Sequence, residues 1–320
     1  MLRFLWLCSV LLLGCPGAPA AEVQPLLVRS TSVGQLFRLN PPVMGVPFDG
    51  DGRSTFEASR TYVNLWARDK RYLVDAEVID DQARMAIGLA DWLQVGVGLS
   101  ARHLAQAQTD QVAITVHDIL MIGQDGRLEV GKHKTRYKIP DYSLEYSKKD
   151  RGLNLSEQIT GDMSIPLYGD AASSWRFSGS LLGSYEMSKA SPYFAGARDL
   201  GLQLNGRYAW DQGAAFGAIT RLSFDQSQQV AVATRPQQGG WVLGYLHRFN
   251  QDQEAVTQFM VYQPVFRQLG QLSRNTYEIH LGYRHHWSRL AFELTLIENM
   301  FYYYNSPDWG FNVGIRSLIF

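Results

Sequence analysis

The chain has 320 residues, of which 46% are hydrophobic, 12% aromatic and 19% charged. Its 30 basic and 30 acidic side chains leave a formal net charge of +0, which argues against nucleic acid or another polyanion as a partner. After the first residues no apolar run reaches the roughly 18 residues of a membrane-spanning helix, so any membrane crossing has to be made by strands.

The first residues read as an export signal. Met1-Leu2-Arg3 is followed by an apolar run and by small residues that end at Ala20, which predicts a signal peptide of residues 1–20 cleaved near Ala20. Both cysteines, Cys8 and Cys15, lie in this leader, so the exported chain would have no disulfide and no cysteine metal ligand. Because Leu12-Leu13-Gly14-Cys15 resembles a lipoprotein processing site, lipidation of Cys15 is an alternative.

Residues 21–53 follow no strand or helix period. They are polar with scattered apolar positions, and turn formers such as Asn40-Pro41-Pro42 interrupt them. We predict that this stretch is a periplasmic arm or a plug in front of a barrel domain of residues 54–320.

From residue 54 onward, apolar and polar side chains alternate along most segments, which is the period of a β-strand. About 12 strands are expected, with ten to fourteen allowed by the uncertain boundaries, since bacterial barrels have even strand numbers. The segments read as strands are 56–67, 72–79, 83–90, 93–99, 142–149, 159–168, 175–186, 200–211, 216–225, 241–249, 256–266, 276–287, 290–296 and 310–320.

The segment 276–287 shows what the alternation means. Tyr277, Ile279 and Leu281 would lie on one face, with Glu278 and His280 on the other. A soluble sandwich would bury the apolar face, whereas a membrane barrel turns it to lipid and turns the polar face to the lumen. The leader and the absence of other cysteines favour the barrel, so we predict an all-β, closed antiparallel transmembrane barrel surrounded by outer-membrane lipid.

Two further features indicate the bacterial outer membrane. Tryptophans near strand ends are typical of the aromatic girdles of such barrels; they are Trp92, Trp175, Trp210, Trp241, Trp287 and Trp309. The last strand ends in Phe320, which resembles outer-membrane proteins and implies the barrel assembly machinery as a partner. Because Phe320 and Ile315 have opposite parity, we expect a bulge near Ser317 or a frayed end.

A long insertion at about 103–141 departs from the strand pattern. Val112, Val116 and Ile119 have helical spacing and Asp110 is placed as an N-cap, which predicts a helix from Asp110 to Ile122. This helix would lie outside the membrane or fold into the lumen and narrow it.

The strand pattern also predicts which charged side chains line the lumen. Both signs are present, so they would either pair across strands and set a modest ion selectivity, or fill the lumen. The lumen-facing candidates are Arg176, Glu186, Arg207, Asp211, Arg221, Asp225, Glu278, His280, Arg284, His286, Glu293 and Arg316.

The sequence offers little sign of covalent chemistry. His280 and His286 share a face with Glu278 and Arg284, which fits a charged wall better than a catalytic site. No phosphate loop, dinucleotide motif or calcium loop is present, so we predict no cofactor and no metal.

Four short motifs carry a family resemblance. They are Asp75-Ala76-Glu77, Val116-His117-Asp118, Gly126-Arg127 and Thr160-Gly161-Asp162. In this order they resemble a family of Gram-negative outer-membrane proteins that carries a domain-of-unknown-function label, and the resemblance implies an outer-membrane barrel without a known substrate. The leading functional hypothesis is a channel or uptake protein for small solutes; the alternatives are a barrel enzyme acting on lipid and a closed barrel with a structural or binding role.

Overall fold

A computed structural model describes residues 24–45, 54–106, 108–119, 127–129, 135–139, 144–150, 152–170, 173–188, 196–227, 233–300 and 305–319. The expected leader, its cleavage site, Cys15 and Phe320 lie outside these residues. Among the described residues, no helix is long and apolar enough to cross a membrane.

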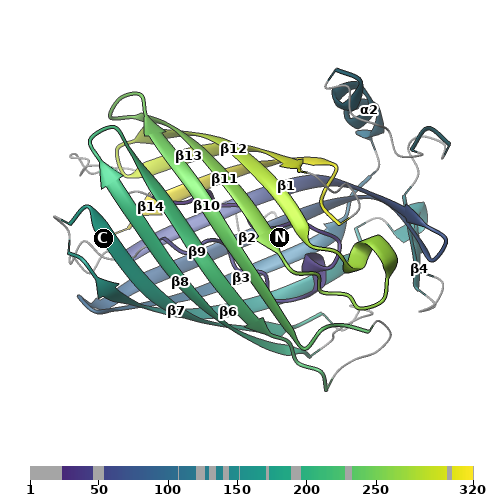
Figure 1. Ribbon diagram of the computed structural model, residues 1–320, viewed down its shortest axis with the longest axis horizontal. Helices are drawn as coiled ribbons and strands as arrows, with labels where there is room; N and C mark the ends of the chain where they lie inside the picture. Colours follow the sequence, from purple (N-terminus) through teal and green to yellow (C-terminus); the bar gives the residue numbers. More distant parts are fainter. Residues whose placement is uncertain are drawn as a thin grey trace.

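The chain forms a closed antiparallel barrel of 12 strands (Figure 1). Each strand pairs with its neighbours in the sheet, and β1 pairs with both β2 and β14, which closes the barrel. The barrel strands are β1 (Ser54–Asp69), β2 (Tyr72–Ala90), β3 (Leu93–Leu104), β6 (Asn154–Tyr168), β7 (Trp175–Glu186), β8 (Arg198–Trp210), β9 (Gly213–Ser223), β10 (Gln237–Arg248), β11 (Gln253–Tyr262), β12 (Thr276–Trp287), β13 (Leu290–Asn299) and β14 (Trp309–Leu318). The predicted fold class and strand number are confirmed.

Three of the expected strand segments differ from the structure. The segments 72–79 and 83–90 are one 19-residue strand, β2, because Asp80 and Asp81 form ion pairs on opposite faces of the strand and do not mark a turn. The segment 142–149 contains β5 (Leu144–Ser147), which pairs with β4 (Arg136–Ile139). This hairpin attaches to the projecting end of β2 and is not part of the closed wall.

The two ends of the barrel differ. At one end, turns of two residues join β2 to β3, β8 to β9 and β12 to β13. At the other end lie the longer connections, such as residues 105–153 and 263–275. We call these the short-turn end and the long-loop end; in outer-membrane barrels the short turns face the periplasm.

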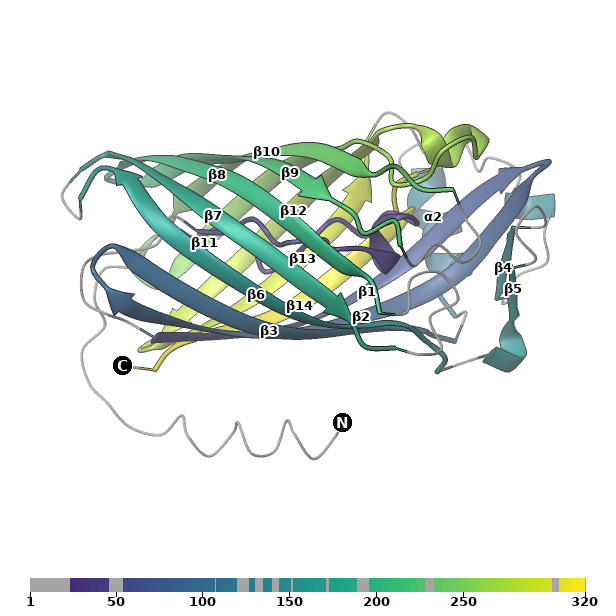
Figure 2. The same ribbon diagram turned by 90° about the horizontal axis from the view of Figure 1, so that it is seen from below.

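Helical structure is confined to short pieces. Helix α2 (Asp110–Ile119) lies beyond the long-loop end, outside the lumen (Figures 1 and 2). Of the two placements that the sequence left open, the structure shows the one outside the lumen, and residues 120–122 of the expected helix lie outside the described residues. The 3-10 turns are η1 (Gln35–Phe37), η2 (Arg127–Glu129), η4 (Lys148–Asp150) and η5 (Gly270–Ser273).

The outer surface is apolar and carries aromatic contacts at the strand ends. Leu200, Leu202 and Leu204 on β8 are each more than half exposed, as the lipid-facing parity predicts. At the short-turn end, aromatic rings touch one another across three strands, in the order Phe177, Trp175, Tyr208, Trp210, Tyr245. This row has the position and composition of an aromatic girdle.

The final strand is regular. β14 pairs with β1 from Thr55–Leu318 to Asn64–Trp309 without a shift in register, and its pairing with β13 is equally regular. The expected bulge near Ser317 is therefore wrong for the described part of the strand.

The interior is filled by a segment of the same chain. Residues 24–45, which we call the lumen segment, run inside the barrel as the purple trace in Figure 2. Nearly all of them are buried. Apolar side chains of the lumen segment, including Leu26, Val28 and Leu36, belong to the main hydrophobic core.

Candidate functional site: the occupied lumen

The lumen segment enters and leaves the barrel near the same end. Its start lies beside Arg316 near the end of β14, at the short-turn end. Gly34 lies against Val265 in the loop after β11, at the long-loop end. Gly45 then lies against the side chain of Gln24. The segment therefore makes a U whose two arms share the short-turn end.

Charged and polar contacts hold the segment to the wall. The contacts are Arg29 with Asp80, Ser30 with Glu278, and Arg38 with Asp199. The Arg29 guanidinium binds both carboxylate oxygens of Asp80 at 2.8 and 2.5 Å, in the bidentate geometry that makes an ion pair strong. Because these groups are almost fully buried, each depends on its partner for the solvation it has lost.

Apolar contacts hold the returning arm. Leu39 and Met44 pack with Leu182 and Leu222 of the wall, and Val43 packs in a second cluster of wall residues. The second cluster consists of Val43, Ala218, Val242, Met260 and Tyr262. The wall facing this arm therefore combines apolar clusters with polar groups, since the backbone N–H groups of Leu39 and Met44 donate hydrogen bonds to Asp199 and Gln203.

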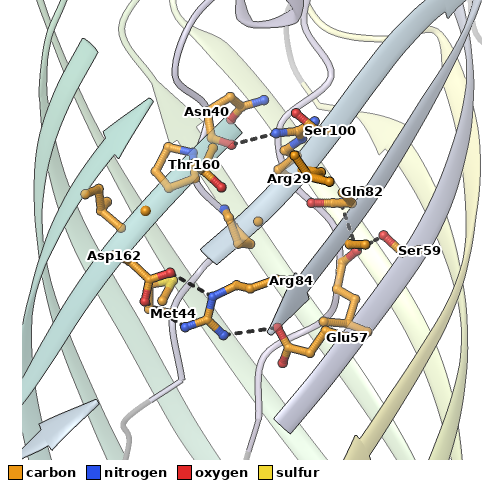
Figure 3. A pocket seen from close by; sticks show the side chains of 18 of the residues that line it. Arg29, Asn40, Met44, Glu57, Ser59, Gln82, Arg84, Ser100, Thr160 and Asp162 are labelled. Atoms are coloured by element: carbon orange, nitrogen blue, oxygen red, sulfur yellow. Dashed lines mark hydrogen bonds and ion pairs between the residues drawn. The ribbon is translucent and has the colours of Figure 1, made fainter. Parts of the chain in front are cut away.

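A cavity of about 60 Å³ remains between the segment and the wall of β1, β2, β3 and β6 (Figure 3). A row of charges crosses it: Arg84 binds Asp162 at 2.7 and 2.9 Å, contacts Glu57 at 3.4 Å, and Glu57 binds Arg316 at 2.8 Å. Gly96 lies beneath the Arg84–Asp162 pair, where a Cβ atom would meet Asp162 at 2.3 Å.

A family model described as "Protein of unknown function (DUF3187)" matches residues 2–318. The chain belongs to the DUF3187 family. A comparison with curated proteins finds no match. The family assignment agrees with the resemblance that the four short motifs carry.

Solved structures similar to this DUF3187 chain are outer-membrane barrels. An outer membrane channel from Pseudomonas putida F1 is 9% identical, with a TM-score of 0.51 over 83% of this chain and 95% of that one. The KdgM porin is 6% identical, with a TM-score of 0.43 over 82% of this chain and 98% of that one. At 9% identity the likeness to the Pseudomonas putida channel shows the fold alone.

Most predicted lumen residues of the DUF3187 chain lie on the inner face. Those almost fully buried there are Arg176, Glu186, Arg207, Glu278, His280, Arg284 and Glu293. His286 and Arg316 are on the same face and partly buried. The structure brings Arg284, His286, Glu293 and Arg316 into one cluster near the start of the lumen segment. Arg284 binds Glu293 at 2.8 Å, and both Arg284 and His286 bind the carboxylate of Glu254 on β11, a residue that the prediction did not include. Arg316 belongs to the cluster because it and Arg284 both donate to the Pro25 carbonyl.

Three predicted lumen residues do not line the lumen. Asp211 is exposed in the turn after β8. Arg221 is exposed on the outer face of β9. Asp225 lies in the loop after β9, where the hydroxyl and backbone N–H of Ser227 donate hydrogen bonds to its carboxylate and lower its pKa.

The error at Arg221 has a physical cause. The prediction turned the apolar parity of β9 to lipid, but Phe216, Ala218 and Leu222 are buried inside and Ile219 is exposed outside. These inner side chains face apolar protein, because Ala218 and Leu222 pack with the lumen segment. Alternation tells the two faces of a strand apart only if the lumen face meets water or charge.

Of the row of charges that crosses the cavity, only Arg316 was among the predicted lumen residues. Arg84, Asp162 and Glu57 occupy inner positions of strands that were predicted, so the alternation rule could have found them. Asp80 was not assigned to a face, because it lies between the expected strands 72–79 and 83–90, which are one strand in the structure. In the part of the chain that the structure describes, no cluster of three or more His, Cys, Asp or Glu residues is placed to hold a metal.

Proposed function

We propose that this DUF3187 protein is an outer-membrane channel for small solutes that is narrowed at rest by its own lumen segment. The observation that carries the proposal is the cavity beside the segment, which the ion pairs of Arg84 cross. The segment contacts strands around the whole wall, among them β2 through Asp80, β8 through Asp199 and β12 through Glu278. Beside it, a cavity lined by Arg84, Asp162 and Glu57 lies along β1, β2, β3 and β6. A closed 12-strand wall is wider than an eight-strand wall, whose side chains fill it, so a removable segment would leave an open pore.

The proposal includes the route to the membrane. The chain is exported with cleavage near Ala20, or is lipidated at Cys15, and the assembly machinery inserts it through the strand that ends at Phe320. No covalent chemistry is part of the proposed function; solutes are selected by the width and the charge of the passage.

Filling the cavity tests the passage directly. Thr160 lines the cavity, whereas Ile159, one residue earlier on β6, points to the outside. Replacing Thr160 by Trp is expected to lower single-channel conductance in planar bilayers severalfold, because the indole takes the space that water and ions would use. The matched variant Ile159→Trp adds the same ring on the lipid side and is expected to conduct like the unchanged protein. Equal conductance of the two variants, or an intact protein without any current, would speak against the proposed passage.

Charge in the passage makes a second prediction. In Asp162→Asn, Arg84 keeps only its 3.4 Å contact with Glu57, whose carboxylate is shared with Arg316. The passage therefore gains positive charge, and the reversal potential in a potassium chloride gradient is expected to shift toward anion selectivity. Glu145→Gln removes the same charge from the exposed β5 hairpin and should leave the reversal potential unchanged. A shift of equal size in both variants would show that the effect is not local to the cavity.

A further inference from the structure

Side chains of the wall near the short-turn end form hydrogen bonds with the backbone at the start of the lumen segment. Arg284 donates hydrogen bonds from one terminal nitrogen to the carbonyl oxygens of Gln24 and Pro25, at 3.1 and 2.9 Å. Arg316 donates a second bond to the Pro25 carbonyl at 3.3 Å. Both arginines are held by wall carboxylates, so they are positioned before any peptide is bound.

The backbone of the next two residues, Leu26 and Leu27, is also hydrogen-bonded to wall side chains. The backbone N–H of Leu26 donates to Gln258 on β11, and that of Leu27 donates to Glu293 on β13, both at 2.7 Å. The carbonyl oxygen of Leu27 accepts bonds from the side chains of Ser59, Gln82 and Asn312. Every one of these contacts uses the main chain of the segment, which any peptide possesses.

Two glycines of the wall accommodate the leucine side chains. A Cβ atom on Gly282 of β12 would meet the Leu26 side chain at 2.3 Å, so no larger residue fits beneath it. A Cβ atom on Gly314 of β14 would lie 3.2 Å from the end of the Leu27 side chain. The two leucines therefore fill neighbouring hollows, with β13 and its Glu293 between them.

We infer that this part of the lumen wall is a binding site for extended peptides with two adjacent leucine-sized residues, and that residues 24–27 are its tethered ligand. Wall side chains bind the main chain of four successive residues, and the two hollows select side-chain size. This combination of main-chain hydrogen bonds with side-chain pockets is how proteins recognise extended peptides. That such peptides are the solutes of the channel rests on the proposed function. That they bind to this site does not depend on it.

A free peptide can replace residues 24–27 without large movement of the rest of the lumen segment. Residues 24–27 lie near the short-turn end, whereas Arg29 and Arg38 hold the segment deeper in the barrel. The first four described residues can therefore detach while the rest of the segment keeps its ion pairs. A free peptide could then bind from the same end.

Fluorescence anisotropy tests the inference with a tetrapeptide amide, labelled at its N-terminus, that has the sequence of residues 24–27. It is titrated into the full refolded chain and into the full chain with Leu26→Ala and Leu27→Ala, which weakens the tethered ligand and leaves the wall unchanged. We expect at least about tenfold tighter binding to the double variant, since each truncated leucine loses buried contacts that the free peptide keeps.

Two control peptides test the two parts of the site. One carries N-methyl groups on both leucine amides, which removes the donors to Gln258 and Glu293 but keeps the side chains; the other has aspartate in place of both leucines. Each is expected to bind at least about tenfold more weakly: the first because it loses hydrogen bonds to one neutral and one charged acceptor, the second because it would bring carboxylates into apolar hollows. No binding to the double variant, or equal binding of all three peptides, overturns the inference. Binding to a chain that shows no ionic current would refute the channel and leave the peptide site standing.

Discussion

A chain without residues 24–45 will conduct ions in planar bilayers several times better than the intact chain. The lumen segment is almost entirely buried in the interior, and a cavity of about 60 Å³ lies beside it. Its removal opens the full width of a 12-strand barrel. The gain in conductance is the largest functional effect that any change to this chain should have.

The barrel should survive the deletion. Its wall is held by backbone pairing around the whole circumference, and none of that pairing involves the segment. Asp80, Asp199 and Glu278 lose their partners on the segment, but water enters the emptied lumen and solvates them. Heat-modifiable mobility on a gel, compared with the intact chain, checks that the deleted chain is still folded.

A reversible lock provides the opposite control. A Cβ atom on Gly314 would lie 3.4 Å from the Cβ of Leu27, close to the separation of about 3.5–4.5 Å found across disulfides. The double variant Leu27→Cys, Gly314→Cys should therefore form a disulfide that joins the segment to β14. The two cysteines of the sequence lie in the expected leader, so they would not compete for this disulfide in the exported chain. Oxidised, this chain should stay at low conductance at all voltages, and a reductant should release it. A folded deletion variant that conducts no better than the locked chain would show that the segment does not block the pore.

The sequence predicted the wall best where both faces of a strand differ in chemistry. On β12, Glu278, His280 and Arg284 are buried inside while Leu281 is exposed, as alternation requires. On β9 the same rule failed because the lumen side is also apolar, where Leu222 packs with Leu39. A rule based on polarity cannot assign faces at a place where protein replaces water.

The path of the lumen segment could not be derived from local patterns. Its hydrogen bonds join Leu26 to Gln258 and Leu27 to Glu293, which are 232 and 266 residues away. Such contacts exist only after the barrel has closed, and they use backbone atoms that leave no mark on the sequence. The pairing of Arg84 with Asp162 likewise depends on the register of β2, β3 and β6. The glycine at position 96 is consistent with this pair, because a larger residue would collide with it, but the glycine alone does not predict the pair.

Replacing Asp80 by Asn will destabilise the folded protein more than any other single change of charge considered above. Asp80 is 1% exposed and binds Arg29 of the segment at 2.5 Å and Arg102 of β3 at 3.3 Å. Without its negative charge, two buried guanidinium groups face each other. Breaking a buried pair in this way typically costs about 3–5 kcal/mol in the free energy of unfolding. Urea unfolding from lipid vesicles, followed by tryptophan fluorescence, measures the loss.

The neighbouring residue is the matched control. Asp81→Asn makes the same substitution one position along β2, on the outer face, where its partner Arg60 is 56% exposed. Its cost should be smaller, since Asp81 is 14% exposed against 1% for Asp80 and its single partner Arg60 reaches solvent, which weakens an ion pair. Adding Arg29→Gln to Asp80→Asn should recover part of the loss, because one of the two opposing charges is then gone, while Arg102 keeps its 2.6 Å bond to the Leu36 carbonyl. If the two substitutions are simply additive, or if Asp81→Asn is as costly as Asp80→Asn, the ion pair is not what holds the segment to the wall, and the apolar contacts of Leu39, Val43 and Met44 must do so.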